Sequence, residues 1–475
     1  MRRRDFLVNS ALGALALTLP RRVFGAVPGD LPDRYWVFVD ANGAWDPTFF
    51  CDPKPEASEL FVHSDVFQSG DLDTNGAGVT YAPFSPGDHY MDLKGEARFF
   101  EKYSDRLRVI NGFDGQTNNH KVGSRSVWSG SLAAGHPSLG GLIAAAYAQV
   151  PASQLPLAFL STGGFDGTQG LVPATRVAET EPLLKLTYPN LKKADKPNLN
   201  FHHADALAEI KKAQAARTER LLEEQGLPQI KAGLERLMSA RNVEGALQQL
   251  MEPLNDPNLL PEVDASISPL LPAARVAMAA MFGGICRCAN LSMAGFDSHS
   301  DHDHPDPAKS GQRPRLRELC YAIDYVWETA KLLGFDDKLV VVVASDFGRT
   351  IYNAPKLQIG DGAYGPGKDH WPITSLMLMA KGGLIPGGVI GETTVNPILN
   401  GVLATHVKAS GESVVLEPGG VDDPTATLIR QVHVHHILRC IAGVKDHPLG
   451  KAYPIWRPGD FPLPIVPGVG GWETF

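Results

Sequence analysis

The side chains best suited to metal chemistry are concentrated in the segment GFDSHSDHDHPD, residues 295–306. Imidazole and carboxylate ligands together suit first-row divalent metals, and one loop can supply two of them. The segment begins G-F-D-x-H directly after an apolar stretch, so we predict Asp297 and His299 as metal ligands. The later residues of the run are more typical of a solvated acidic loop: Asp301, His302, Asp303 and His304.

A second carboxylate follows a run that predicts a strand buried on both faces. Residues 340–345 read VVVVAS, and continuous β-branched runs of this kind occur in parallel sheets covered by helices on both sides. Ligands gather beyond the carboxyl ends of such strands. We therefore expect Asp346 to bind a metal and Arg349, three residues later, to bind an anionic group with its guanidinium.

Three further loops carry candidate residues. They are Asp40 and Asp46 after the first expected strand, His120, Ser124 and Arg125 in TNNHKVGSRSVWSGS, and Asp369 and His370 in GPGKDHWP. No G-x-S-x-G turn surrounds Ser124, which makes it a weak candidate for a nucleophile. Residues 362–368 match G-x-x-x-x-G-K, but Asp369 replaces the Ser or Thr and neither a preceding strand nor a following helix is evident, which excludes a P-loop.

The elements that must position these residues alternate between strands and helices. We expect strands at Tyr35–Val39, Leu107–Ile110, residues 155–161 and Leu339–Ser345, and helices at Ala273–Ala289, Arg315–Leu333 and Ala426–Ala442. This alternation predicts an α/β fold with a mostly parallel central sheet and helices on both faces. Residues 203–252 are rich in Ala, Glu, Lys, Leu and Arg near helical spacing, which predicts a helical insertion within one domain, residues 27–475.

The N-terminus has the features of an export signal. Arg3 and Arg4 precede the apolar stretch Val8–Leu19, which is shorter than the roughly 20 residues that a spanning helix needs. We interpret residues 1–26 as a twin-arginine signal, which predicts passage through the Tat translocase to the periplasm or the exterior. We expect no stable transmembrane segment.

Charge and cysteine usage narrow the class of protein further. The chain of 475 residues has a formal net charge of −8, and removal of the arginine-rich signal would make it more acidic, which argues against nucleic acid as a partner. Its five cysteines are scattered and include no zinc-type C-x-x-C pair. Buried free thiols are the preferred interpretation, and one disulfide stays an alternative.

In their order along the chain, these segments resemble a known superfamily. The stretches VFVDANG, NHKVGSRSVWSG, GFDSHSD, VVVASDFGRT and GKDHWP occupy the places of the site motifs of the alkaline phosphatase and sulfatase-like superfamily. More narrowly, the chain resembles the exported domain-of-unknown-function 1501 family in its twin-arginine start and its G-F-D-S-H, D-F-G-R-T and D-H segments. Two departures stand out: His120 occupies the place of the nucleophile, and Phe347 replaces the His of S-D-H-G.

The resemblance implies a metal-dependent hydrolase of sulfate or phosphate esters. A divalent ion (zinc, manganese, iron or calcium) would act as Lewis acid, Arg349 or Arg125 would hold the oxyanion of a small anionic substrate, and His120 would be general acid or base for an attacking water. Ser124, four residues further into the expected helix, should point elsewhere. The alternative is a non-catalytic binding or scaffold protein of the envelope that keeps the fold.

Overall fold

A computed structural model describes most of the chain. It covers residues 31–57, 72–82, 97–148, 157–176, 199–241, 253–302, 307–351, 367–408 and 425–456, together with shorter pieces between and after them. The predicted export signal, residues 1–26, lies outside the described residues, as do Asp303 and His304. In the part that is described, no helix combines the length and the apolar character needed to cross a membrane.

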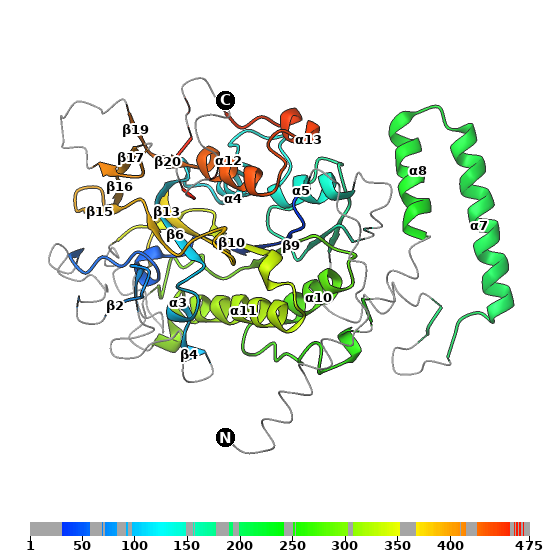
Figure 1. Cartoon of the computed structure of the whole chain (residues 1–475), viewed down its shortest axis with the longest axis horizontal. Coiled ribbons are helices and arrows are strands. Elements are labelled where there is room, and N and C mark those ends of the chain that lie inside the picture. The colour runs from blue at the N-terminus through cyan, green and yellow to red at the C-terminus, as the bar shows by residue number, and fades with distance from the viewer. Residues whose placement is uncertain are drawn as a thin grey trace, which may run out of the picture.

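A central sheet of nine strands organises the described chain (Figure 1). Its order is β14-β6-β13-β10-β1-β9-β7-β8, and β20 also pairs with β6. The strands are β1 (Tyr35–Ala41), β6 (Leu107–Asp114), β7 (Phe159–Ser161), β8 (Ala174–Arg176), β9 (Cys288–Met293), β10 (Leu339–Ser345), β13 (Ile373–Ala380), β14 (Gly388–Ile390) and β20 (Ile429–Arg430). Within this sheet β13 pairs antiparallel with β10 and β6, and the other pairings are parallel. The predicted mostly parallel sheet is confirmed.

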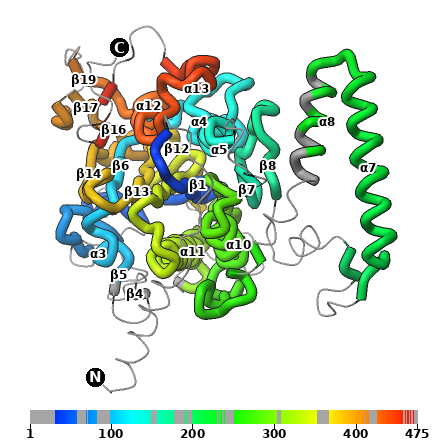
Figure 2. Tube along the Cα trace, turned by 45° about the vertical axis from the view of Figure 1, so that its right-hand side comes forward, coloured from blue at the N-terminus to red at the C-terminus, as the bar shows by residue number. Residues whose placement is uncertain are grey.

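Helices cover both faces of the sheet, as the sequence predicts. Figures 1 and 2 place α4 (His120–Ser129), α5 (Leu139–Ala148), α12 (Gln431–Ile441) and α13 (Pro448–Ala452) on one side, and α10 (Leu271–Phe282) and α11 (Arg313–Leu332) on the other. The smaller elements are η1 (Pro47–Phe49), β2 (Asp73–Thr74), β3 (Thr80–Tyr81), β4 (Asp92–Leu93), β5 (Ala97–Arg98), α3 (Phe99–Lys102), η3 (Pro307–Lys309), η4 (Asp336–Lys338), β11 (Gly348–Arg349), β12 (His370–Trp371), β15 (Thr393–Asn396), β16 (Gly401–Ala404), β17 (His406–Lys408), β18 (Ser413–Val414) and β19 (Ala426–Thr427).

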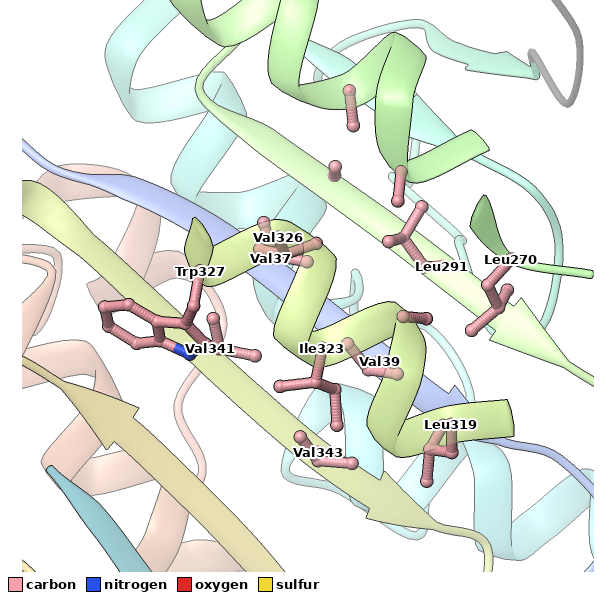
Figure 3. Packing of buried hydrophobic residues seen from close by; sticks show 14 of the residues in the cluster. Val37, Val39, Leu270, Leu291, Leu319, Ile323, Val326, Trp327, Val341 and Val343 are labelled. Carbon is pink, nitrogen blue, oxygen red and sulfur yellow. The ribbon is translucent and has the colours of Figure 1, made fainter. Parts of the chain in front are cut away.

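The two central strands are buried on both faces because their alternate side chains enter two separate cores. In β10, Val341 and Val343 join the core beneath α11, whereas Val340 and Val342 join the core on the side of α4 and α5. Figure 3 shows Ile323 of α11 lying against the valines of β10 and β1. Successive strand residues point to opposite faces, so a continuous run of valines fills both cores at once.

The segment expected to be a helical insertion contains two antiparallel helices, α7 (Ala204–Glu224) and α8 (Pro228–Arg241). In Figures 1 and 2 they lie beside the sheet and its covering helices. The side chains of α7 are almost all exposed, and Thr218 is the buried one. Helix formation here therefore follows from local propensity more than from packing on the core. The division of the chain into domains remains a prediction.

Two expected helix boundaries are wrong. The helix expected at Ala273–Ala289 ends at Phe282, where Gly284 adopts the left-handed backbone conformation that stops a helix, and the missed strand β9 follows. The helix expected from Ala426 begins at Gln431, because β20 pairs with β6 immediately before it. Four of the five cysteines are buried and all five are free, in agreement with the preferred interpretation.

Helix α12 fixes the position of α4. The His435 Nε2 donates a hydrogen bond of 2.7 Å to the carbonyl oxygen of Val127, in the last turn of α4. The His435 ring also lies against Gly130, where a Cβ would come within 2.8 Å of it. Burial lowers the pKa of His435 to about 3, so the imidazole is neutral in the folded protein.

We predict that His435 makes the folded protein sensitive to acid. The pKa of His435 is lower in the folded protein than in the unfolded chain, where it is about 6.5. The stability that this difference provides is fully present above pH 6.5, and it is lost as the pH falls from there towards the pKa of the folded state. The free energy of unfolding should fall by up to about 1.4 kcal/mol for each pH unit through this one group. Urea denaturation between pH 7 and pH 5 measures the slope.

The comparison needs two variants. His435→Gln keeps an amide donor for Val127 and should flatten the pH dependence, whereas His203→Gln, at an exposed position, should keep the wild-type slope. Equal slopes in all three proteins would contradict the prediction.

Candidate metal centre

The candidate site begins with a buried carboxylate at the carboxyl end of β10. Asp346 is fully buried, and its Oδ1 accepts hydrogen bonds from the Ala44 N–H at 2.5 Å, the Gly43 N–H at 3.3 Å and the Ser345 hydroxyl at 2.9 Å. The two amides come from the turn that follows β1, the neighbouring strand. The buried charge is thereby stabilised by oriented dipoles.

The turn at Gly43 and Ala44 requires an unusual backbone. Both residues have positive φ angles, 115° and 67°, and this lets both N–H groups point to Asp346. A Cβ at Gly43 would lie 2.6 Å from the backbone nitrogen of Asp297. Glycine at this position therefore allows the loop that carries Asp297 to approach the end of β1.

His120 is the first residue of α4 and faces this carboxylate. The Asn119 side chain caps the helix by accepting from the Val122 N–H, which fixes the start of the helix. His120 Nδ1 makes a short hydrogen bond to Asp346 Oδ2, and this bond raises the pKa of His120 against the opposing effect of partial burial. With the Nδ1–H committed to a carboxylate, the Nε2 lone pair faces the other way, and His120 Nε2 lies 3.6 Å from Asp297 Oδ2.

His370 is held in the same manner. The short pairing of β11 with β12 brings His370 opposite Arg349. Its Nδ1 lies 2.9 Å from the carbonyl oxygen of Asn118, and because a carbonyl can only accept, Nδ1 carries the proton. His370 Nε2 therefore presents a lone pair, and it lies 3.6 Å from Asp297 Oδ1 and 2.9 Å from His299 Nε2.

Asp297 and His299 complete the group. His299 Nε2 lies 3.1 Å from Asp297 Oδ1, and about half of the Asp297 side chain is exposed. Partial burial acts to raise the pKa of Asp297, but the hydrogen bond and charge of Arg349 outweigh it and lower the pKa. Burial, followed by the charge of Arg349, lowers the pKa of His299. Both residues thus favour the unprotonated forms that bind metals.

The residues fit a borderline divalent metal. Four ligands placed tetrahedrally at about 2.1 Å from an ion are roughly 3.4 Å from one another. The Nε2 atoms of His120, His299 and His370 lie 3.1 to 3.6 Å from an Asp297 oxygen, and those of His299 and His370 lie 2.9 Å apart. Two overlapping groups could hold an ion, and they share His370: one with His120 and Asp297, the other with His299 and Asp369. Imidazole-rich sets of this kind suit zinc, manganese or iron better than calcium.

Asp346 and Asp369 take different places in this arrangement. Asp346 was expected to bind the metal, but the structure places the His120 ring between its carboxylate and the other ligands, the position of an outer partner that orients a metal-binding histidine. Asp369 is 81% exposed, and its Oδ1 lies 4.0 Å from His299 Nδ1.

Asp40 does not join the cluster. It is fully buried at the end of β1, where it accepts hydrogen bonds from Trp128 Nε1 at 3.0 Å and the Ser292 hydroxyl at 2.8 Å. Burial raises its pKa to about 6, and no described basic side chain offsets this. Both of its carboxylate oxygens accept from neutral donors, and the expected role of Asp40 as a ligand stays a prediction.

Asp46 does not join the cluster either. Its Oδ2 lies 2.7 Å from Lys368 Nζ and 2.8 Å from His302 Nε2, and its Oδ1 accepts from the Thr48 hydroxyl and N–H. Burial opposes ionisation, but the Lys368 charge outweighs it and lowers the pKa of Asp46. In this structure a lysine ammonium and a histidine bind the Asp46 carboxylate, and its expected ligand role stays a prediction.

The side chains of Arg349 and Arg125 bind mainly backbone carbonyl oxygens of neighbouring loops. Arg349 is fully buried and donates to the carbonyl oxygens of Gly43, Ala44, Phe296 and Lys368, and also to Asp297 Oδ1 at 2.8 Å. Arg125 donates to the Leu132 carbonyl oxygen with Nε and Nη2. The expected role of Arg349 and Arg125 in holding a substrate oxyanion stays a prediction. Ser124 is buried on α4, and its hydroxyl has no hydrogen-bond partner among the described residues.

Two buried residues near the candidate site, His302 and Lys368, are not predicted by the sequence. His302 was expected in a solvated loop, but it is fully buried with Asp46, and burial lowers its pKa to about 4. In the sequence, Lys368 is the last residue of the G-x-x-x-x-G-K match at residues 362–368, which lacks the other features of a P-loop. Neither residue has a local signal in the sequence, because their partner Asp46 is 256 and 322 residues away along the chain.

Comparison with known proteins gives a family match and weak structural similarities. A family model described as "Protein of unknown function (DUF1501)" matches residues 34–399. No curated protein matches the chain. A mutant of TAB5 alkaline phosphatase with bound Mg shows 13% identity and a TM-score of 0.28, over 76% of this chain and 94% of that chain.

Two further solved structures are similar at the same level. The Bacteroides thetaiotaomicron protein BT33494S-sulf, from work on glycosaminoglycan metabolism, shows 9% identity and a TM-score of 0.32 over 89% of this chain and 74% of its own. The PsFucS1 sulfatase from Pseudoalteromonas sp. shows 11% identity and a TM-score of 0.23 over 82% and 68%. Similarities this weak say nothing about the chemistry of the site, which rests on its own geometry.

We predict that Asp346→Asn weakens metal binding without removing a direct ligand. The amide keeps the size of the side chain but loses the charge that orients His120, and changes to such outer partners typically cost about 10- to 100-fold in metal affinity. Zinc competition with a chromophoric chelator measures the change. His370→Ala should lose more affinity and Ser124→Ala none. Wild-type affinity in Asp346→Asn would show that this carboxylate does not act through His120.

Proposed function

We propose, on the premise that this chain belongs to the DUF1501 family of proteins of unknown function, that it is a divalent-metal-dependent hydrolase of sulfate or phosphate esters. The family description assigns no activity. The observation that carries the proposal is the orientation of His120 and His370: the Asp346 carboxylate holds the Nδ1–H of His120 and the Asn118 carbonyl holds that of His370, so both Nε2 lone pairs face Asp297. Histidines constrained in this way are typical of metal ligands.

The proposed ligands are His120, His299 and His370, with Asp297 as the carboxylate. A divalent ion bound there would supply Lewis acidity and lower the pKa of a bound water towards neutrality. One carboxylate does not neutralise a doubly charged ion, and Arg349 adds a positive charge behind Asp297. The centre therefore favours an anionic ester, in which the leaving group and the transferred group both carry oxygen atoms that a cation can stabilise.

The proposal changes the role expected for His120. Its Nδ1 is committed to Asp346 and its Nε2 faces the other ligands, so it holds the ion instead of transferring protons. Asp369 is the group available to accept a proton from an attacking water. Its Oδ1 accepts a hydrogen bond of 2.8 Å from the backbone N–H of His370, and the rest of the carboxylate faces solvent.

Export belongs to the same proposal. We retain the twin-arginine signal at residues 1–26 and passage through the Tat translocase as predictions, with the mature protein acting in the periplasm or outside the cell. Fractionation of cells that express Arg3→Lys, Arg4→Lys tests this part separately from the chemistry: retention in the cytoplasm supports it and unchanged export contradicts it.

We predict hydrolysis of an aryl sulfate or of a phosphate mono- or diester by protein loaded with zinc, manganese or iron. His299→Ala should reduce the turnover number by at least about 100-fold, since a metal centre supplies several kcal/mol of transition-state stabilisation. A panel of nitrophenyl esters, assayed with each metal and after chelation, measures this.

Ser124→Ala is the matched control, because a serine-nucleophile enzyme would lose activity in it and the proposed enzyme would not. Full activity after chelation would exclude a metal-dependent reaction. Bound metal with uniform inactivity would favour the non-catalytic binding protein.

A further inference from the structure

A second polar cluster lies next to the candidate metal centre and is completely buried. It contains Asp46, His302 and Lys368, each with no more than 1% of its surface exposed. Asp46 Oδ2 receives Lys368 Nζ at 2.7 Å and His302 Nε2 at 2.8 Å. The proposed ligands do not include any of the three residues.

The three residues come from three different segments. Asp46 follows the turn after β1, His302 lies in the segment after β9 that carries Asp297 and His299, and Lys368 stands two residues before His370. One carboxylate oxygen is thus a buried point at which the two ligand-bearing loops are joined. The contacts join residues that the chain separates by more than 250 positions.

The loop of Asp297 and His299 is attached to Asp46 by a second route. Ser298 Oγ hydrogen-bonds His302 Nδ1 at 2.7 Å and accepts from Gln312 Nε2 at 2.9 Å. The Gln312 Oε1 accepts the Asp46 N–H at 3.0 Å. Ser298 lies between the two proposed ligands, so this network restrains the loop at Ser298 as well as at His302.

We propose that Asp46 is a positioning residue for the candidate metal centre, which through Lys368 and His302 holds the loops of His370 and of Asp297 and His299 at a fixed separation. This inference rests on the proposed function, because a positioning role requires that the two loops bind a metal. Ligand atoms must stay within a few tenths of an ångström of their places for metal binding, and partners beyond the ligands supply that restraint.

The chain offers a matched control for this pair. Lys54 Nζ lies 2.7 Å from Asp52 Oδ1, with side chains only 9% and 7% exposed. This pair has the same length and nearly the same burial as the Asp46–Lys368 pair, but neither residue belongs to a ligand-bearing loop. Any general effect of losing a buried ion pair should appear in both places.

The experiment replaces each pair by apolar side chains. Buried ion pairs exchanged for apolar residues of similar size often keep or gain stability, whereas removal of one partner leaves an unpaired charge. The two proteins are the double variants Asp46→Leu/Lys368→Met and Asp52→Leu/Lys54→Met. Thermal unfolding of each establishes that it folds.

Two measurements then separate positioning from stability. Hydrogen exchange of the metal-free proteins, followed in peptides over residues 296–302 and 367–371, should become faster in the Asp46 variant and stay at the wild-type rate in the Asp52 variant. Zinc competition should show an affinity about 10- to 100-fold weaker in the Asp46 variant alone.

The outcomes distinguish this inference from the proposed function. Unchanged exchange in both loops of the Asp46 variant overturns the positioning role, and so does an equal change in the Asp52 variant. If the wild-type protein binds no zinc, manganese or iron, the proposed function fails, and the exchange measurement still decides whether Asp46 holds the two loops. Faster exchange with unchanged zinc affinity also overturns the inference, because the restraint would then not serve the metal.

Discussion

The site depends on the burial of one charged group, the carboxylate of Asp346. An ionised carboxylate removed from water is costly unless donors surround it. Here the donors are the amides of Gly43 and Ala44, the Ser345 hydroxyl and the His120 ring. These donors must point at the Asp346 carboxylate, so its burial constrains the turn after β1 and the position of His120 at the start of α4. The imidazole that neutralises the charge is then left with its other nitrogen facing Asp297.

Arg349 complements this carboxylate on the other side of the turn. Its guanidinium binds carbonyl oxygens from three segments, the turn at Gly43, the loop at Phe296 and the loop at Lys368. A planar fork with several donors suits this task better than a lysine would. The same three segments meet again at Asp46, so a cation and an anion, both buried, join them at two points. Such double attachment gives the open part of the site a rigid support.

The sequence predicts those parts of the site that local patterns encode. The valine run predicts β10 and its end at Asp346, and the G-F-D-x-H segment indicates Asp297 and His299 as candidate ligands. Hydrophobic patterns in the sequence do not indicate which carboxylate a distant lysine or histidine will contact. The burial of Lys368 and His302 against Asp46 could therefore not be predicted. The end of the helix at Phe282 was missed for a related reason, because an apolar stretch continues across Gly284 into β9 and the change of period is too short to see.

Three aspartates near the ends of β1 and β10 show why residue type alone does not define a ligand. Asp40 meets only neutral donors, and burial raises its pKa to about 6. Asp46 meets a lysine, whose charge keeps it ionised despite burial. Asp346 meets a histidine that also faces the cluster. All three are satisfied inside the protein, whereas Asp297 is half-exposed and Asp369 is largely exposed beside the same histidines. Exposure and neighbouring imidazoles, more than residue type, therefore mark the carboxylates that could face a cation.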